Sequence, residues 1–397
     1  MMKILLISNT LPPEGSAVAG IVDRLAPQWI KSGCEVDGIT LKKKLRAKTK
    51  FFYDGITVYR AERFLFFKKL SNLVKRVYRK LFKKTEKRVL YVEYEVKAYL
   101  RQLKKMDLRQ YDAMIPICAY YETVEAVRRY KNKYGLTTPV FLYQVDPLAY
   151  NKTFDALDFD ARLAYEKEIY SLCAGVFTTS IILREKQALG WDTEKIHVLE
   201  FPLSKALLET SEQNDGSIQC VFCGSLYGTV RDAKYTLELF AKFKNPNIHL
   251  YVLGTGQERL LKEYAEGVLK GRLFCFGERS EKECNEMLAR ADVLVNVGNQ
   301  VKNQIPSKIF HYISTGKPIV NVACFDDCPT AEYLNKYPLC YTIVEKAEAR
   351  ESDVSALEEW IVIHQGKKVS VETLQKHFQE HDPAFIVEKM LAIIKRS

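Results

Sequence analysis

Strand-length apolar runs alternate with helical stretches along almost the whole chain. A helix is predicted from about Ala19 to Ser32, where Gly33 stops it and Pro27 is expected to kink it. Strands separated by helices are typical of parallel sheets that are covered on both faces. The strands predicted in the first half are Lys3–Ser8, Glu35–Leu41, Ile56–Arg60, Ala113–Cys118, Val140–Val145, Gly175–Ser180 and Ile196–Leu199.

The alternation is interrupted once and then starts again. The stretch from Ser204 to Ser217 has almost nothing to bury, and we interpret it as a linker. After it, Ser280 and Glu283 have the spacing of a capping box that opens a helix reaching Ala291. The strands predicted in the second half are Ile218–Gly224, Ile248–Leu253, Arg272–Phe276, Val293–Val297, Pro318–Ala323 and Tyr341–Val344, with further helices near Arg231–Phe243 and from Glu258.

The predicted fold class is α/β, with two tandem Rossmann-like, doubly wound domains facing each other across a cleft. A chain of 397 residues is long enough for two or three domains, each with its own core. Ligands of such sheets bind beyond the carboxyl ends of the strands, so the cleft is the expected site. The predicted ranges are 1–203 for the first domain, with a basic segment over 60–110, 204–217 for the linker, 218–380 for the second domain, and 381–397 for a helix packing back on the first domain.

Composition favours a protein of the cell interior. No apolar run reaches the roughly 18 residues that a membrane span needs, and the first residues do not form a secretory signal. The cysteines at 220, 223, 275 and 324 lie in apolar runs, which predicts small buried hydrophobes rather than a disulfide framework. The Cys220–Cys223 spacing suits zinc or redox chemistry, but no second pair lies nearby, so a metal or redox role is disfavoured.

Nearly all of the net charge of +11 comes from one segment. Twelve Lys or Arg and only two acids lie between Arg60 and Arg88. The apolar residues of Leu65–Lys84 recur at a helical period, with basic residues opposite or beside them. Either this helix packs on its own domain, or it lies on anionic lipid, where each basic residue contributes roughly 1 kcal/mol to the binding free energy. Nucleic acid is disfavoured because no recognition module accompanies the segment.

The stretch from Asn303 to Val320 predicts a loop, a short helix and a buried strand. Pro306 suits the first helical position, and Gly316 suits the position just past the helix end. The amides of Ser307 and Lys308 would then emerge from a positively polarised helix end, beside the lysine side chain, where a diphosphate is held well. On spacing alone, an ordinary surface helix of an α/β domain is an equally open interpretation.

Taken in order, the segments of the chain resemble the GT-B-fold retaining glycosyltransferases of family 4, also called group 1. The resemblance covers essentially the whole chain and is strongest in the second half. Each segment alone is weak, but their order and spacing together are specific. The segments that carry it are Cys223–Leu226, Tyr251–Arg259, Phe274–Arg279, Ala289–Val295 and Gly316–Val320.

The resemblance implies transfer of a sugar from a nucleotide donor, with retention of configuration. The donor would bind the second domain and the acceptor the first. The family needs no metal and no cofactor beyond the nucleotide-sugar, because fixed amides and cations stabilise the departing diphosphate. Carried over by position, the residues implied are Gly224 at the phosphates, Arg231 and Lys308 at the diphosphate with Ser307 beside them, and Gly277, Glu278 and Arg279 around the nucleobase.

Two positions depart from the family pattern. Where the family often has two glutamates eight positions apart, this chain has Asn303 and His311, and neither supplies a carboxylate. His311 either bonds a donor hydroxyl or is a satisfied helix histidine. Where the family often has a histidine near the acceptor, the strand end here leads to Asp146 and Pro147. Asp146 either orients a substrate or is a turn residue.

Three further patterns carry little weight. His377 to His381 fits an inverted zinc-protease motif, but no third ligand is evident. Asp158-Phe-Asp160 resembles a metal-binding pair but lies in an acidic, helical segment. Gly254-Thr-Gly256 lacks the third glycine of a dinucleotide loop, so a dehydrogenase is disfavoured.

The function expected from these observations is a cytoplasmic, metal-independent glycosyltransferase, peripheral at the inner face of the membrane. It would use a nucleotide-sugar, which we expect to be a UDP-sugar, and a lipid-linked or oligosaccharide acceptor in cell-surface polysaccharide synthesis. The expected partners are these substrates and an anionic membrane surface, without nucleic acid. The alternatives are a nucleotide-sugar epimerase or hydrolase of the same fold, and a catalytically silent membrane-docking partner.

Overall fold

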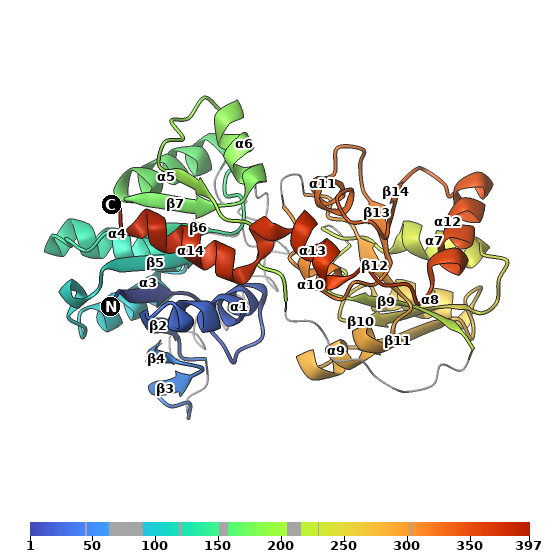
Figure 1. Cartoon of the computed structure of the whole chain (residues 1–397), viewed down its shortest axis with the longest axis horizontal. Helices are drawn as coiled ribbons and strands as arrows, with labels where there is room; N and C mark the ends of the chain where they lie inside the picture. Colours follow the sequence, from blue (N-terminus) through green and yellow to red (C-terminus); the bar gives the residue numbers. More distant parts are fainter. Residues whose placement is uncertain are drawn as a thin grey trace, which may run out of the picture. The chain divides into compact units, whose positions relative to one another are not determined.

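The chain folds into two compact units, as the computed structural model shows (Figure 1). The first contains Met1–Pro202 and Glu380–Ser397, and the second contains Leu203–Gln379. Predictions that concern Asn303, the basic residues at 63–89 and the linker centre at 205–215 lie outside the residues that the structure describes. The described ranges are 1–43, 46–62, 90–118, 121–150, 158–204, 216–228, 230–301 and 304–397.

The first unit is built on an eight-stranded sheet with the order β3-β4-β2-β1-β5-β6-β7-β8. Neighbouring strands are parallel except β3, which pairs antiparallel with β4. The parallel, helix-covered sheet confirms the predicted fold class. The strands are β1 (Lys3–Ile7), β2 (Glu35–Leu41), β3 (Lys50–Tyr53), β4 (Ile56–Ala61), β5 (Ala113–Cys118), β6 (Phe141–Gln144), β7 (Gly175–Thr178) and β8 (Ile196–Val198).

The first helix of this unit begins at a side-chain cap. Helix α1 (Ala17–Lys31) begins where the Ser16 side chain accepts a hydrogen bond from the Ala19 amide at 3.0 Å, two residues earlier than predicted, and Pro27 lies inside it. Helix α14 (Pro383–Ile394) packs against α1 within this unit (Figure 1). The other helices are α3 (Glu93–Leu103), α4 (Glu122–Tyr134), α5 (Phe159–Leu172) and α6 (Ser180–Ala188), with a short turn η1 (Leu108–Gln110).

The second unit contains a six-stranded sheet with the order β11-β10-β9-β12-β13-β14, and all of its pairs are parallel. Its central strands are almost entirely buried, which their near-continuous apolar sequences require. The strands are β9 (Ile218–Cys223), β10 (Ile248–Leu253), β11 (Leu273–Gly277), β12 (Val293–Val297), β13 (Ile319–Ala323) and β14 (Cys340–Val344).

Seven helices cover this sheet in the described part of the second unit. Helix α9 begins at the predicted capping box, in which the Ser280 hydroxyl bonds the Glu283 amide and the Glu283 carboxylate bonds the Ser280 amide. The helices are α7 (Lys234–Lys242), α8 (Glu258–Glu266), α9 (Glu281–Arg290), α10 (Lys308–Ser314), α11 (Pro329–Leu334), α12 (Glu351–His364) and α13 (Val371–His377).

Two expectations about cysteine and histidine side chains need correction. All ten cysteines are free, but Cys275 is exposed because it lies in the partly exposed edge strand β11, and Cys324, which follows β13, is half-buried. His377 ends α13, whereas His381 is buried in a separate turn and bonds the Phe201 carbonyl at 2.8 Å. The two imidazoles therefore do not lie on one helix.

No helix among the described residues is long and apolar enough to cross a membrane.

Candidate anion-binding site in the second unit

Glycines follow the adjacent strands β9 and β10 and let their loops pack together. The Gly224 amide donates to the Leu253 carbonyl at 2.6 Å, and the Leu226 amide donates to the Thr255 carbonyl at 2.8 Å. A Cβ at Gly254 would overlap the Gly224 carbonyl, and both Gly254 and Gly256 have positive φ, at 140° and 98°. Backbone rather than side chains therefore lines this edge of the sheet.

Lys308 occupies the space beside Gly224. Its ammonium donates to the Cys223 carbonyl, and a Cβ at Gly224 would overlap the ammonium. Burial and, to a lesser extent, the neighbouring Arg231 charge lower the pKa of Lys308 from 10.5 to about 8, against an opposing effect of the thiols of Cys223 and Cys284. The fold thus holds an ammonium in poorly solvated surroundings at the end of β9.

Arg231 supplies the second cation from the loop between β9 and α7. Its guanidinium donates to the Ser225 carbonyl at 3.2 Å and to the Asn299 side-chain oxygen at 2.7 Å. Its Nε is buried and has no hydrogen-bond partner within the described ranges. Burial also lowers the pKa of Arg231. A buried N–H without an acceptor is costly, so this donor is suited to a ligand oxygen.

The loop that carries Arg231 is fixed on both sides. The Gln257 side chain donates to the Asp232 carboxylate at 2.7 Å and accepts from the Ala233 amide at 2.9 Å. On the other side, the Gln300 amide donates to the Val230 carbonyl at 2.8 Å. The guanidinium is therefore positioned by loops that follow β9, β10 and β12.

The two cations are not neutralised by protein acids. In the part of the chain that the structure describes, neither Arg231 nor Lys308 forms an ion pair with a carboxylate. Glu345, at the end of β14, has its pKa raised to about 7 by burial and by the negative charge of Asp232, which disfavours its ionised form. An anion with two charges would relieve the repulsion between the buried cations.

The start of α10 differs in detail from the prediction. The first helical residue is Lys308 and Ser307 is the N-cap, so Pro306 lies before the cap rather than at the first helical position. The Pro306 carbonyl accepts a hydrogen bond from the Ile309 amide at 3.1 Å in the turn that leads into the helix. Gly316 lies just past the helix end with φ of 72°, as predicted. Because α10 has only seven residues, the side-chain cations outweigh its dipole.

The remaining expected donor residues lie around this edge. Gly277 ends β11 with φ of 66°, and its carbonyl accepts from the Gly254 amide at 2.8 Å. Glu278 and Arg279 follow it and are exposed. His311, on α10, bonds the Ser204 hydroxyl through Nδ1 at 2.8 Å. Gly277 thus contacts the loop after β10, and His311 lies on the same helix as Lys308, whereas Asn303 falls outside the described residues.

Asp146 belongs to the first unit, not to this site in the second. It follows β6, and the Gln144 side chain donates to its backbone oxygen at 3.0 Å. Gln144 is itself held by Glu166 at 2.6 Å. Asp146 thus lies at the carboxyl edge of the first sheet, where ligands of doubly wound sheets bind.

Sequence reasoning missed two residues that support the site. Asn299 accepts a hydrogen bond from the Arg231 guanidinium, and the Tyr312 hydroxyl accepts from the amide of Cys223, the residue whose carbonyl bonds Lys308, at 2.9 Å. The only sequence signal for Asn299 is its place just after the buried strand Val293–Val297, where polar side chains collect at a sheet edge. Within the described ranges, no three His, Cys, Asp or Glu side chains form a group suited to a metal ion.

Comparison with known proteins identifies part of the chain. Residues 217–336 match the sequence model of the family described as "Glycosyl transferases group 1". A search of curated proteins finds no significant match. The matched residues contain Gly224, Arg231 and Lys308, together with the glycine loops after β9 and β10.

Solved structures match the chain over its whole length. The apo form of the lipopolysaccharide outer core galactosyltransferase WaaB is 14% identical with a TM-score of 0.62, covering 100% of this chain and 99% of that one. Sucrose-phosphate synthase from Thermosynechococcus elongatus is 13% identical with a TM-score of 0.66, covering 100% and 99%. An S. aureus TarM variant in complex with fondaparinux, alpha-GlcNAc-glycerol and UDP is 14% identical with a TM-score of 0.64, covering 99% and 100%. The chain therefore has the GT-B fold, and its residues 217–336 match the group 1 glycosyltransferase family.

Proposed function

We propose that the chain transfers a sugar from a UDP-sugar to a saccharide or lipid-linked acceptor, with retention of configuration and without a metal. One observation carries the proposal: Arg231 and Lys308, both half-buried, with pKa values lowered by burial and without an acidic partner among the described residues, lie at the glycine-lined end of β9. The likeness to TarM, whose solved complex contains UDP, supports the choice of nucleotide.

The reaction places its negative charge on the leaving group. As the bond between sugar and diphosphate breaks, Lys308 and the free Nε–H of Arg231 stabilise the departing phosphate oxygens. Gly224 leaves room for the Lys308 ammonium that faces the diphosphate, because a Cβ there would overlap it. The acceptor hydroxyl passes its proton to the departing phosphate, so the protein supplies no nucleophile.

The remaining expected residues receive binding roles in this proposal. Gly277, Glu278 and Arg279 hold the nucleobase, and Ser307 bonds the diphosphate. His311 and Asn303 contact the donor sugar or ribose in place of the usual glutamates. Asp146 orients the acceptor from the first unit. These assignments rest on position in the chain and on the sheet edges described above.

The acceptor is proposed to belong to cell-surface polysaccharide synthesis at the inner face of the membrane. The likeness to WaaB, a lipopolysaccharide galactosyltransferase, supports this pathway. The membrane part rests on the twelve basic and two acidic residues between Arg60 and Arg88. Flotation with anionic vesicles, with and without residues 64–88, tests it. Equal flotation of the two proteins would remove the membrane claim.

The donor claim is tested by thermal unfolding with UDP, followed by turnover of UDP-sugars. UDP at 100 times its dissociation constant should stabilise the protein by about 2.7 kcal/mol. The variant Arg231→Met should lose this effect, whereas the exposed control Lys262→Ala should keep it. Donor consumption that needs no acceptor would instead indicate an epimerase or hydrolase. Binding without turnover across many acceptors would indicate a silent partner.

A further inference from the structure

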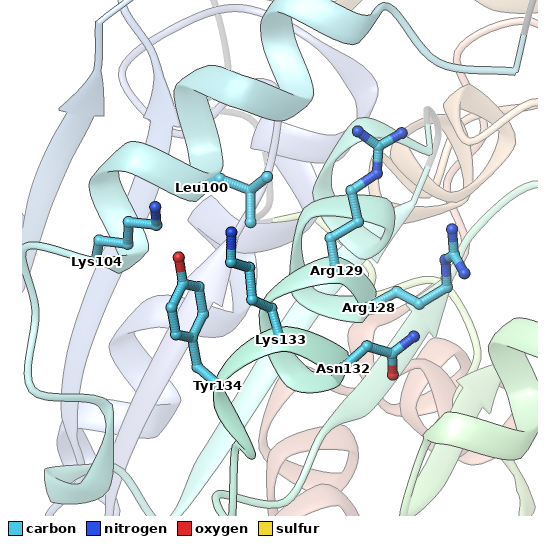
Figure 2. Close-up of a pocket in the computed structure, with 7 residues that line it drawn as sticks. All are labelled: Leu100, Lys104, Arg128, Arg129, Asn132, Lys133 and Tyr134. Carbon is cyan, nitrogen blue, oxygen red and sulfur yellow. The ribbon is translucent and has the colours of Figure 1, made fainter.

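A second basic site lies on the first unit, in a groove of about 490 Å³ between α3 and α4. Figure 2 shows its lining side chains, among which are two arginines, two lysines, an asparagine and a tyrosine. The lysines and Asn132 are exposed, and the arginines are half-buried. The groove is therefore open to a ligand from solvent.

The two arginines are committed to carboxylates. Arg128 bonds Glu125 at 2.8 Å and Glu168 at 2.7 Å. Arg129 bonds Glu125 at 2.6 Å and Glu93 at 2.8 Å. This network of three acids and two arginines fixes one wall of the groove and has a formal net charge of −1, so the arginines leave no positive charge for a ligand.

The two lysines have no such acids. Lys104 and Lys133 place their ammonium groups 5.2 and 5.7 Å from the centre of the Tyr134 ring. Figure 2 shows the Tyr134 hydroxyl between the two ammonium groups. Neither lysine has an ion pair with a carboxylate elsewhere in the described ranges. Two ammonium groups thus lie beside one tyrosine ring, and neither is paired with a carboxylate in the part of the chain that the structure describes.

The groove is not part of the edge where substrates of such folds bind. It lies at the carboxyl ends of α3 and α4, close to the turns that lead into the strands. The Thr138 hydroxyl, after α4, bonds the Leu108 carbonyl, after α3, at 2.8 Å, and the Pro139 carbonyl accepts from the Met114 amide near the start of β5. Asp146, in contrast, follows the end of β6.

We propose that this groove binds a phosphate group. Lys104 and Lys133 act as point charges, and the Tyr134 hydroxyl donates to a phosphate oxygen. The helix carboxyl ends repel anions, which limits the affinity for a single free phosphate. The phosphate belongs either to a soluble molecule or to a lipid headgroup. The proposal does not depend on the sugar-transfer reaction.

The test compares the full-length protein with the double variant Lys104→Ala/Lys133→Ala. A second double variant, Lys262→Ala/Lys376→Ala, removes the same charge from exposed helix positions of the second unit. In one arm, inorganic phosphate is titrated against protein with carbon-13-labelled tyrosine at constant ionic strength. The Tyr134 resonance, identified with Tyr134→Phe, is followed by NMR. In the other arm, flotation is measured with phosphatidylglycerol vesicles and with phosphatidylcholine vesicles.

The proposal predicts saturable binding in at least one arm. The Tyr134 resonance should shift with phosphate, or the protein should float with phosphatidylglycerol only. The groove variant should weaken that binding about 30-fold, as two lysines imply, and the control variant by much less. Response to phosphate alone identifies a soluble ligand, and response to vesicles alone identifies a headgroup. Equal behaviour of both variants in both arms, or no binding in either, would overturn the proposal.

Discussion

Replacing Lys308 with methionine should stabilise the protein while removing diphosphate binding. Methionine keeps the unbranched stem of the side chain but carries no charge. In the native protein the ammonium is buried beside Arg231, so folding must partly remove it from water and place it near a like charge. A stabilising loss of function of this kind is expected where a site is strained for its ligand.

The size of the effect follows from the lowered pKa of Lys308. A fall from 10.5 to about 8 corresponds to about 3.5 kcal/mol, at about 1.4 kcal/mol for each pH unit. Loss of the hydrogen bond to the Cys223 carbonyl offsets about 1 kcal/mol of this gain. At pH 7 the free energy of unfolding of the variant should therefore exceed that of the native protein by about 2.5 kcal/mol.

The pH dependence gives this prediction its sign. Between about pH 8 and 10.5 the unfolded chain binds the lysine proton and the folded chain does not, so the penalty shrinks as pH rises. The advantage of Lys308→Met should be largest below pH 8 and should disappear above 10.5. Denaturant unfolding at pH 7 and pH 10, with UDP titrations at pH 7, measures both effects.

Lys317 provides a matched control from the same unit. Its ammonium donates to the carbonyls of Ala289 and Ala291 at the end of α9, at 2.7 and 2.5 Å. Lys317→Met should therefore destabilise the protein and leave UDP binding intact. If Lys308→Met destabilises the protein as Lys317→Met does, or still binds UDP with native affinity, the account of the buried ammonium is wrong.

Three further predictions concern the same two units. Above pH 8, UDP affinity should fall by up to tenfold for each pH unit, because Lys308 loses its proton. Calorimetric titration with UDP measures this affinity, and an affinity that stays constant from pH 7 to 9.5 would contradict the prediction. Gly254→Ala should lower the free energy of unfolding, measured with denaturant, by more than about 3 kcal/mol, because φ is 140° and the new Cβ would overlap backbone atoms. Gly190→Ala, which has open space around the new Cβ, should lower it by less. Lys186→Met should cost about 3–5 kcal/mol, because it leaves the buried acids Glu166 and Glu185 without their ammonium; near-native stability would exclude a role for that pair.

Much of the fold was accessible from local sequence signals. The bounds of Ile248–Leu253 and Val293–Val297 match the prediction, because continuous apolar runs of strand length have few alternatives in a covered parallel sheet. The strand Lys50–Tyr53 was missed because it is short and half-exposed. The Asp54-Gly55 dipeptide that follows the strand is a hairpin-turn signal that could have identified it, and both residues have positive φ in the structure.

The candidate site was accessible only in part. Gly224, Arg231 and Lys308 could be named from their positions in the family pattern, and the structure brings all three together in the second unit. The residues that position them could not be named from the sequence, because they are distant along the chain: Asn299 and Arg231 are 68 residues apart, and Tyr312 and Cys223 are 89 residues apart. Such contacts depend on how the loops beyond the strands close, which local periodicity does not encode.

The most direct test of the donor site is a crystal structure with UDP bound. Diphosphate oxygens are expected within about 3 Å of the Lys308 ammonium and of the Arg231 Nε, next to Gly224. This contact would give the buried Nε–H an acceptor that the protein itself does not supply in its described residues. A diphosphate bound away from these three residues would contradict the central claim.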